Sequence, residues 1–92
     1  MPWFVKTEVF RESRDQLGLF LEAHQNWIRE LQAKGQPILS GFLVKNNKSP
    51  GGGLFLFYAD NYSEAEKLIQ QDPLIVNNCV QWELYEWVGA IK

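Results

Sequence analysis

The sequence predicts an α+β fold, a ferredoxin-like βαββαβ sandwich in which a four-stranded antiparallel sheet carries two helices on one face. Two observations support this prediction. Strand-like segments with alternating side chains are interleaved with two segments whose apolar residues recur every three or four positions. Right-handed crossover connections then place both helices on the same face of the sheet. The 92 residues are enough for one domain, which we expect to span residues 1–92.

The four expected strands cover residues 3–10, 38–45, 53–59 and 82–88. Each is rich in aromatic, β-branched or leucine residues and is bounded by residues typical of turns. The segment KNNKSPGGG, between the second and third strands, consists largely of residues that tolerate a positive φ. We therefore expect a turn there.

The two expected helices begin at capping-box patterns, in which a serine is followed three positions later by Gln or Glu. Ser13 with Gln16 opens the first helix, and Ser63 with Glu66 opens the second. Gly35 is expected to end the first helix, since glycine adopts the left-handed conformation found after helix C-termini. The apolar face of the first helix comprises Leu17, Phe20, Leu21, His24, Ile28 and Leu31, and that of the second comprises Ala65, Leu68, Ile69 and Asp72.

Both faces of the expected sheet are apolar. On the third strand Leu54, Leu56 and Tyr58 point one way, and Phe55, Phe57 and Ala59 point the other way. An antiparallel sheet with one solvated face normally carries polar residues on that face. Two helices on one side cannot cover both faces. We therefore predict a homodimer, a dimeric α+β barrel, that buries Phe55 and Phe57 or their neighbours of opposite parity.

Composition and charge disfavour several classes of function. The net charge of −2 provides no basic field for nucleic acid or for an anionic membrane. The sequence contains no stretch of about 18 apolar residues, the length needed to span a bilayer. The N-terminal segment has the pattern of a strand and not that of a signal peptide. We expect a cytoplasmic protein that binds neither nucleic acid nor membrane.

The glycine-rich segment and the single cysteine are further features that could indicate a functional site. GGGLFLFY partly matches an RNA-binding pattern, but Gly51 and Gly53 stand where a basic residue and a stacking aromatic are required. The one histidine and the one cysteine, Cys79, form no metal-ligand spacing. Cys79 is expected to be a small packing residue because no basic residue flanks it. No cofactor or metal is expected.

Asp72 and His24 are polar residues on apolar helix faces. Pro73 disfavours helical geometry at Asp72, which places the carboxylate at a helix C-terminus, where the helix dipole disfavours negative charge. His24 could donate a hydrogen bond to Asp72, and a carboxylate that orients an imidazole is a minimal general acid–base unit. Alternatively, His24 bonds a backbone carbonyl and Asp72 forms a turn.

Several segments together resemble the YciI-like (YCII-related) family: LEAHQNWIRELQAKGQPILSGFL, GGGLFLFYADNYSEAEKLIQQDP and the terminal WELYEW. The resemblance extends from about Phe4 to Trp87. It implies a dimeric ferredoxin-like fold and a catalytic pair at His24 and Asp72. One relative in the family is linked to dehydrochlorination of a chlorinated hydroxyquinol, and the fold resembles that of muconolactone isomerase.

The matching positions also suggest substrate-binding residues. Ser40 and Gly41 form the small-residue–glycine step in the second strand, Gly53 lies in the glycine-rich start of the third, and Pro73 belongs to the Asp-Pro step. Ser40 could donate to a substrate oxygen or pack beside Gly41. Gly53 could admit a ligand close to the backbone or belong to a flexible turn.

The sequence departs from the family pattern in three places. Leu74 replaces a common aromatic residue after Asp-Pro, and Asn77 and Asn78 replace a small-residue–glycine pair, although asparagine also tolerates the left-handed conformation. An arginine that precedes the histidine in some members is absent. Arg14 or Lys6 could bind a substrate anion in its place.

The resemblance implies a small cofactor-free enzyme of lyase, isomerase or dehydrochlorinase type. In it, His24 would move a proton on a small cyclic or phenolic substrate, and Asp72 would orient the imidazole. The alternative is a non-catalytic ligand-binding or protein-interaction module on the same dimeric fold.

Overall fold

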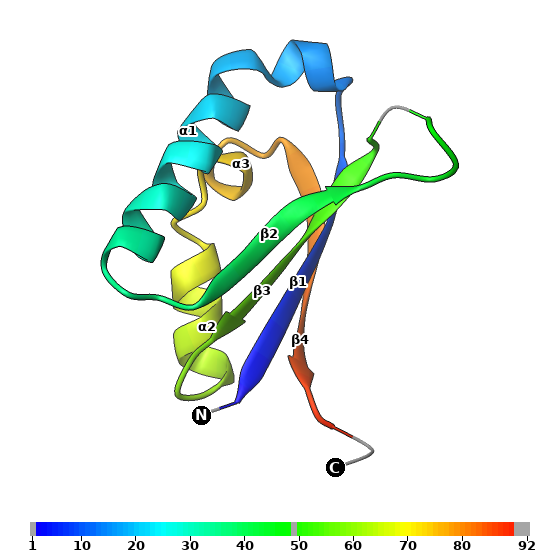
Figure 1. The fold of residues 1–92 in the computed structure, drawn as a ribbon. Coiled ribbons are helices and arrows are strands. Elements are labelled where there is room, and N and C mark those ends of the chain that lie inside the picture. Colours follow the sequence, from blue (N-terminus) through cyan, green and yellow to red (C-terminus); the bar gives the residue numbers. More distant parts are fainter. Residues whose placement is uncertain (1, 49, 90–92) are drawn as a thin grey trace.

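The computed structural model describes residues 2–48 and 50–89, and it describes only the backbone of Arg14. Four strands form one antiparallel sheet, and the helices lie on one of its faces (Figure 1). The elements are β1 (Trp3–Phe10), α1 (Arg14–Ala33), β2 (Ile38–Leu43), β3 (Gly52–Tyr58), α2 (Tyr62–Ile69), α3 (Pro73–Val76) and β4 (Val80–Trp87).

The sheet has the strand order β2-β3-β1-β4, so β1 pairs with both β3 and β4 in the interior of the sheet. This order and the helices on one face confirm the predicted ferredoxin-like fold. The register places Phe4 opposite Phe57 of β3 and opposite Glu86 of β4. β1 has the predicted ends, and the ends of the other strands differ from the prediction by at most two residues.

The helix starts differ from the prediction in their capping groups. Ser13 precedes α1, but its side chain makes no capping hydrogen bond, and Gln16 N–H donates to the Ser13 backbone carbonyl at 2.9 Å. For α2 the cap is Asn61, whose side chain accepts a hydrogen bond from Glu64 N–H at 2.9 Å. Asn61 has extended backbone angles and lies three residues before an acidic residue, so it satisfies the same capping pattern two positions earlier than Ser63.

Gly18 breaks the regular geometry of α1. Its φ of 39° and ψ of −112° are not helical, and they separate the first turn from the long remainder of the helix. Phe20, two residues further on, was predicted on the apolar face of this helix but is 44% exposed. At the other end, Gly35 has a φ of 89° and donates to Gln32 O at 3.0 Å, which confirms its role in ending the helix.

The short helix α3 was not predicted, and it changes the position of Asp72. Helix α2 ends at Ile69, and Asp72 is the N-cap of α3, with Pro73 in the first turn. The expectation that Asp72 ends the second helix on its apolar face is therefore wrong. Proline at a first helical turn is favourable because its missing N–H would have no partner there.

The core lies between the helices and one face of the sheet. Phe55 and Phe57 are almost completely buried in it, so of the two sets proposed for a dimer interface the neighbours of opposite parity remain. The larger buried cluster comprises Phe4, Ile28, Ile38, Phe55, Phe57, Ala59, Ala65, Ile69 and Leu84. The smaller comprises Leu17, Leu21, Leu74, Cys79 and Val80.

The opposite face of the sheet, which we call the outer face, carries no helix in the described part of the chain. Its apolar residues include exposed side chains at Leu39 (66%), Leu43 (51%) and Trp87 (59%). Others are partly buried: Trp3, Val5, Leu54, Leu56 and Tyr58. An apolar surface of this extent is unusual for a monomer in water. Among the helices described, none is long and apolar enough to cross a membrane.

Candidate functional site

His24 and Asp72 meet in the interior between α1 and α3. His24 Nδ1 lies 2.7 Å from Asp72 Oδ1, although 48 residues separate the two in the sequence. Asp72 is fully buried and His24 is 8% exposed. The bond to Nδ1 leaves Nε2 as the imidazole nitrogen that can exchange a proton with another group.

Two charged residues of β1 extend this pair into a buried network. Lys6 Nζ donates to Asp72 Oδ2 at 3.0 Å, and it also forms a short contact with Glu8 Oε1. The Lys6 ammonium lies 5.5 Å from the centroid of the Phe55 ring, within the range of a cation–π interaction. Lys6 is fully buried and Glu8 is 8% exposed, so this charge network is almost entirely shielded from water.

The geometry around Asp72 stabilises its ionised form. Burial by itself raises the pKa of the Asp72 carboxyl, but the hydrogen bond from His24 and the positive charge of Lys6 outweigh burial. The N–H of Leu74 donates to Oδ1 at 2.9 Å and acts in the same direction. The pKa of Asp72 therefore lies below its ordinary value, and Asp72 is a carboxylate at neutral pH.

The local sequence explains why Asp72 points into this site. The Asp-Pro step starts α3, and an N-cap carboxylate is stabilised by the backbone N–H groups at a helix start. Asn78, just after α3, has a φ of 56°, the left-handed conformation expected for asparagine. The sequence had suggested that the Asp72 carboxylate lies at a helix C-terminus, where the helix dipole disfavours it. It lies instead at a helix N-terminus, where the dipole favours a negative charge.

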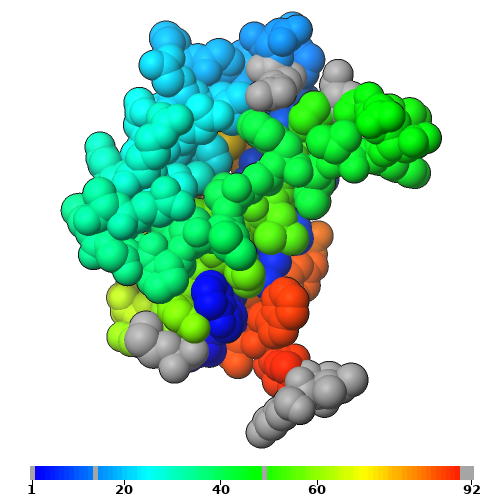
Figure 2. All heavy atoms as spheres, viewed as in Figure 1, coloured from blue at the N-terminus to red at the C-terminus, as the bar shows by residue number. Residues whose placement is uncertain are grey.

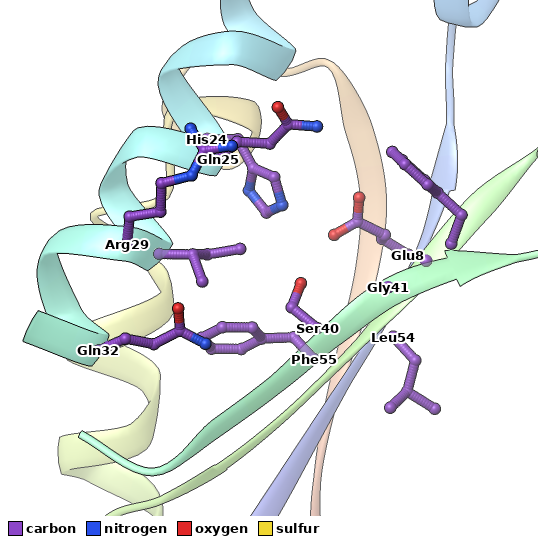
Figure 3. Close-up of a pocket in the computed structure, with 12 residues that line it drawn as sticks. Glu8, His24, Gln25, Arg29, Gln32, Ser40, Gly41, Leu54 and Phe55 are labelled. Carbon is purple, nitrogen blue, oxygen red and sulfur yellow. The ribbon is translucent and has the colours of Figure 1, made fainter. Parts of the chain in front are cut away.

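A cavity of about 240 Å³ adjoins His24 between α1 and the sheet. In Figure 2 it is seen as a hollow between α1 and β2. Figure 3 shows His24 and Glu8 facing each other across this space, with Ser40 and Phe55 below them. The complete lining comprises Glu8, His24, Gln25, Ile28, Arg29, Gln32, Ser40, Gly41, Phe42, Gly53, Leu54 and Phe55.

The structure gathers most of the residues that the sequence suggested for a site. His24, Ser40, Gly41 and Gly53 all line the cavity. Asp72 lies behind His24 and does not line it. Pro73 also lies outside the lining, because it is in the first turn of α3.

Gly53 allows β2 and β3 to lie close together beside the cavity. A Cβ atom at this position would lie 2.8 Å from the backbone oxygen of Gly41 and 3.8 Å from Glu8 Cδ. The first distance is a steric clash with backbone. The absence of a side chain at Gly53 therefore permits the approach of β2 and leaves space beside Glu8.

Lys6 and Glu8 were not predicted as site residues. Lys6 was considered only as a binder of substrate anions, but its ammonium is occupied by Glu8 and Asp72. The side chain of Arg14, the other candidate, lies outside the described residues. One signal could have revealed the pair, namely that Lys6 and Glu8 share the parity of Phe4, a core residue of the same strand.

Cys79 is buried and takes no part in the cavity. Burial raises the pKa of its thiol, and the negative charges of Asp72 and Glu12 raise it further. Such a thiol is a poor nucleophile at neutral pH. Within the described residues, no group of three or more His, Cys, Asp or Glu side chains could hold a metal ion.

Comparison with known proteins identifies a fold class. No protein-family model matches this chain, and no curated protein is significantly similar to it in sequence. Solved structures do match over nearly the whole chain, and they are ferredoxin-like α+β proteins. A dimeric ferredoxin-like protein from an uncultured marine organism is 13% identical with a TM-score of 0.59, covering 100% of this chain and 99% of that one.

Two of the similar structures are enzymes. The 5-chloro-2-hydroxyhydroquinone dehydrochlorinase of Burkholderia phenoliruptrix, in complex with 2,5-dihydroxybenzoquinone, is 16% identical with a TM-score of 0.76, covering 94% of this chain and 93% of that one. The cofactor-independent oxygenase SnoaB of Streptomyces nogalater is 7% identical with a TM-score of 0.56, covering 99% and 94%. At these identities the likeness shows a shared fold.

Proposed function

We propose that this chain is a YciI-like protein and a small cofactor-free enzyme of the lyase, isomerase or dehydrochlorinase type. Its substrate is a small cyclic or phenolic molecule, and His24 and Asp72 are the catalytic pair. The observation that carries the proposal is the 2.7 Å contact between His24 Nδ1 and the Asp72 carboxylate, in which His24 also lines a cavity.

In this proposal Asp72 fixes the tautomer of His24 by accepting a hydrogen bond from Nδ1–H. Nε2 then acts as the base that removes a proton from a substrate hydroxyl. A base of this kind typically contributes a factor of about 10² to 10⁴ in rate. Asp72 does not become protonated in the cycle, because its pKa lies below the ordinary carboxyl value.

The substrate class is supported by the cavity and by the similar enzymes. About 240 Å³ accommodates a single substituted ring. Phe55 and Ile28 provide apolar walls, and Ser40 supplies a hydroxyl. One similar structure is a dehydrochlorinase that holds a dihydroxybenzoquinone, a ring of the same class.

We further propose that the protein is a cytoplasmic homodimer in which two outer faces pack together. The exposed apolar side chains of Leu39, Leu43 and Trp87 support this assembly, since a second identical sheet would cover them. One of the similar structures is described as a dimeric ferredoxin-like protein.

A ligand-binding module without catalysis is the second candidate. The observation in its favour is that Asp72 divides its interactions between His24 and Lys6, an arrangement that also serves a purely structural network. In that case the cavity would bind a ring and release it unchanged.

The test is a turnover assay with 5-chloro-2-hydroxyhydroquinone under anaerobic conditions. Loss of HCl from this substrate yields a hydroxybenzoquinone, so chloride release and quinone absorbance should rise together. We expect turnover by the wild-type protein and a fall in kcat of about 10² to 10⁴ for His24→Gln. Glu22→Gln, an exposed change on the same helix, is the control and should leave kcat unchanged.

Two results would contradict the catalytic proposal. One is equal turnover by wild type and His24→Gln. The other is saturable binding of the ring by wild type, with no turnover of this substrate or of other halogenated hydroxyquinols, which would favour the ligand-binding module.

A further inference from the structure

Glu8 occupies a position in the cavity that the His24–Asp72 pair does not explain. It comes from β1, on the wall opposite α1, and its side chain is directed toward His24 (Figure 3). The residue is only 8% exposed, yet it lines the cavity. A ligand in this cavity must therefore be compatible with a buried carboxylate on the wall, because burying such a group without a partner is costly.

The hydrogen bonds of Glu8 leave part of its capacity unused. Lys6 Nζ contacts Oε1, and Lys6 is shared with Asp72. A carboxylate can accept about four hydrogen bonds through its two oxygens, so Oε2 retains the capacity to accept from a ligand. The space beside it is kept open because Gly53 has no side chain there.

The positive charges near the cavity are not placed to bind an anion beside Glu8. Lys6 does not line the cavity, and its ammonium is held by two carboxylates. Arg29 lines it from α1, but its Nη1 donates to Asn26 Oδ1 at 3.0 Å on the same helix. Figure 3 shows Arg29 directed along α1 and not across the cavity toward Glu8.

We propose that Glu8 is a substrate-contacting residue that determines specificity. Its Oε2 accepts a hydrogen bond from a ring hydroxyl, and its charge excludes rings that bear a carboxylate. The cavity therefore selects neutral, hydroxyl-bearing rings. This inference deepens the proposed function by naming a substrate class, and it rests on that function only in taking the cavity as the ligand site.

The physical basis is differential affinity. A site that pairs a buried acceptor with a ligand hydroxyl rejects ligands that lack the donor, because the acceptor then loses water without compensation. A second negative charge beside a buried carboxylate is a repulsive element, and repulsion is a common source of specificity. Ser40, on the adjacent strand, can serve the same ring as donor or acceptor.

The experiment compares two probes that differ by one group, hydroquinone and 2,5-dihydroxybenzoate. Binding to the full chain at pH 7 is followed by nuclear magnetic resonance titration of the backbone amides. We expect wild-type protein to bind hydroquinone at least tenfold more tightly than 2,5-dihydroxybenzoate. Glu8→Gln keeps the size of the side chain and removes its charge, and it should reduce that ratio to threefold or less. Glu30→Gln, the same charge change on the exposed face of α1, should leave the ratio unchanged.

The wild-type ratio decides the proposal even if Glu8→Gln does not fold. Equal or tighter binding of 2,5-dihydroxybenzoate by wild type would overturn it and would assign anion binding to Arg29. A wild-type preference that persists unchanged in folded Glu8→Gln would also overturn it. Binding is measured without turnover, so a failure of the catalytic proposal at His24 leaves this result intact and distinguishable.

Discussion

The two faces of β1 reverse the usual arrangement of a sheet. On the side covered by helices, the strand carries Lys6 and Glu8 next to Phe4, and all three are buried. On the outer face it carries Trp3 and Val5, which are only partly buried. The comparison shows that polarity alone does not reveal which face of a strand is inside. Charged side chains can be buried when they neutralise one another, and apolar side chains can remain outside when a partner is to cover them.

The two faces also differ in what a substitution would do. Removing one member of a buried ionic network leaves the remaining charges buried without a partner, which is strongly destabilising. Replacing the whole network by apolar residues would cost much less. Changing a side chain on the outer face should alter contacts within the proposed dimer and leave the folded subunit intact. The following predictions test this difference, from the largest expected effect to the smallest.

Lys6→Met should produce the largest loss of stability. The substitution keeps an apolar stem but leaves Glu8 and Asp72 without their shared cation. We expect the free energy of unfolding to fall by about 3–5 kcal/mol, measured by urea denaturation at pH 7. Lys67→Met is the control, because Lys67 pairs with Glu64 on the surface, and it should cost less than about 0.5 kcal/mol. Similar losses for both variants would contradict the contrast between buried and exposed charges.

Asp72→Asn should lower stability by about 1.5–3 kcal/mol at pH 7, because hydrogen bonds to a charged group are lost. The loss should depend on pH. The pKa of Asp72 is lowered in the folded state, so its stabilising contribution is complete above the unfolded carboxyl pKa of about 3.9. That contribution disappears as the pH falls through the folded-state value.

Thermal unfolding of wild type and Asp72→Asn between pH 2 and pH 7, in steps of about one unit, measures this dependence. The two curves should converge at the acid end. Asp60→Asn, at an exposed position before α2, should follow the wild type throughout. A constant difference between wild type and Asp72→Asn across the range would show that the charge of Asp72 does not contribute.

Leu39→Glu should separate the proposed dimer with little effect on the fold. Leu39 is 66% exposed on the outer face, so a charge there costs the subunit less than about 0.5 kcal/mol. Light scattering at micromolar concentration should report twice the 10.7 kDa chain mass for wild type and a single chain for the variant. Leu19→Glu, on α1 and 80% exposed, should remain dimeric. A monomeric wild type would refute the assembly.

The smallest effect concerns Cys79, which lies on the covered side and should react slowly. Its thiol is buried and has a raised pKa, so little thiolate is present or accessible in the folded protein. Iodoacetamide should modify the native protein far more slowly than the protein in denaturant. The rate for the native protein should still be rising at a pH at which an ordinary thiol is already fully ionised. Equal rates in both states would place Cys79 at the surface.

The sequence predicted the order of the four strands and the two longer helices because that order depends on local patterns. Alternation marked the strands, a spacing of three and four marked the helices, and Gly35 marked a helix end. The meeting of His24 with Asp72 was proposed from the dipole at a helix C-terminus. The contact is present, but the stated reason was wrong, because Asp72 begins the unpredicted helix α3.

Other features depended on information that local patterns do not contain. Lys6 and Glu8 alternate with apolar residues in a way that fits either face of a strand, so their burial depends on which face the helices cover. Ser63 was predicted as the cap of α2, but the cap is Asn61, which offers the same side-chain acceptor two positions earlier. Gly18 gave no signal in the helical pattern.

The buried charges of β1 also resolve an ambiguity in how this strand can pair. Because apolar side chains lie on both of its faces, hydrophobicity alone would allow β1 to slide past β3 and β4 by one residue. Such a slip would turn Val5 and Thr7 toward Asp72 and would turn Lys6 and Glu8 toward the opposite side. Asp72 would then be sealed in the core without its cation, at a cost of several kcal/mol. The buried charges that form the candidate site thus disfavour a slip of β1 by one residue and help to fix the alignment of the strands.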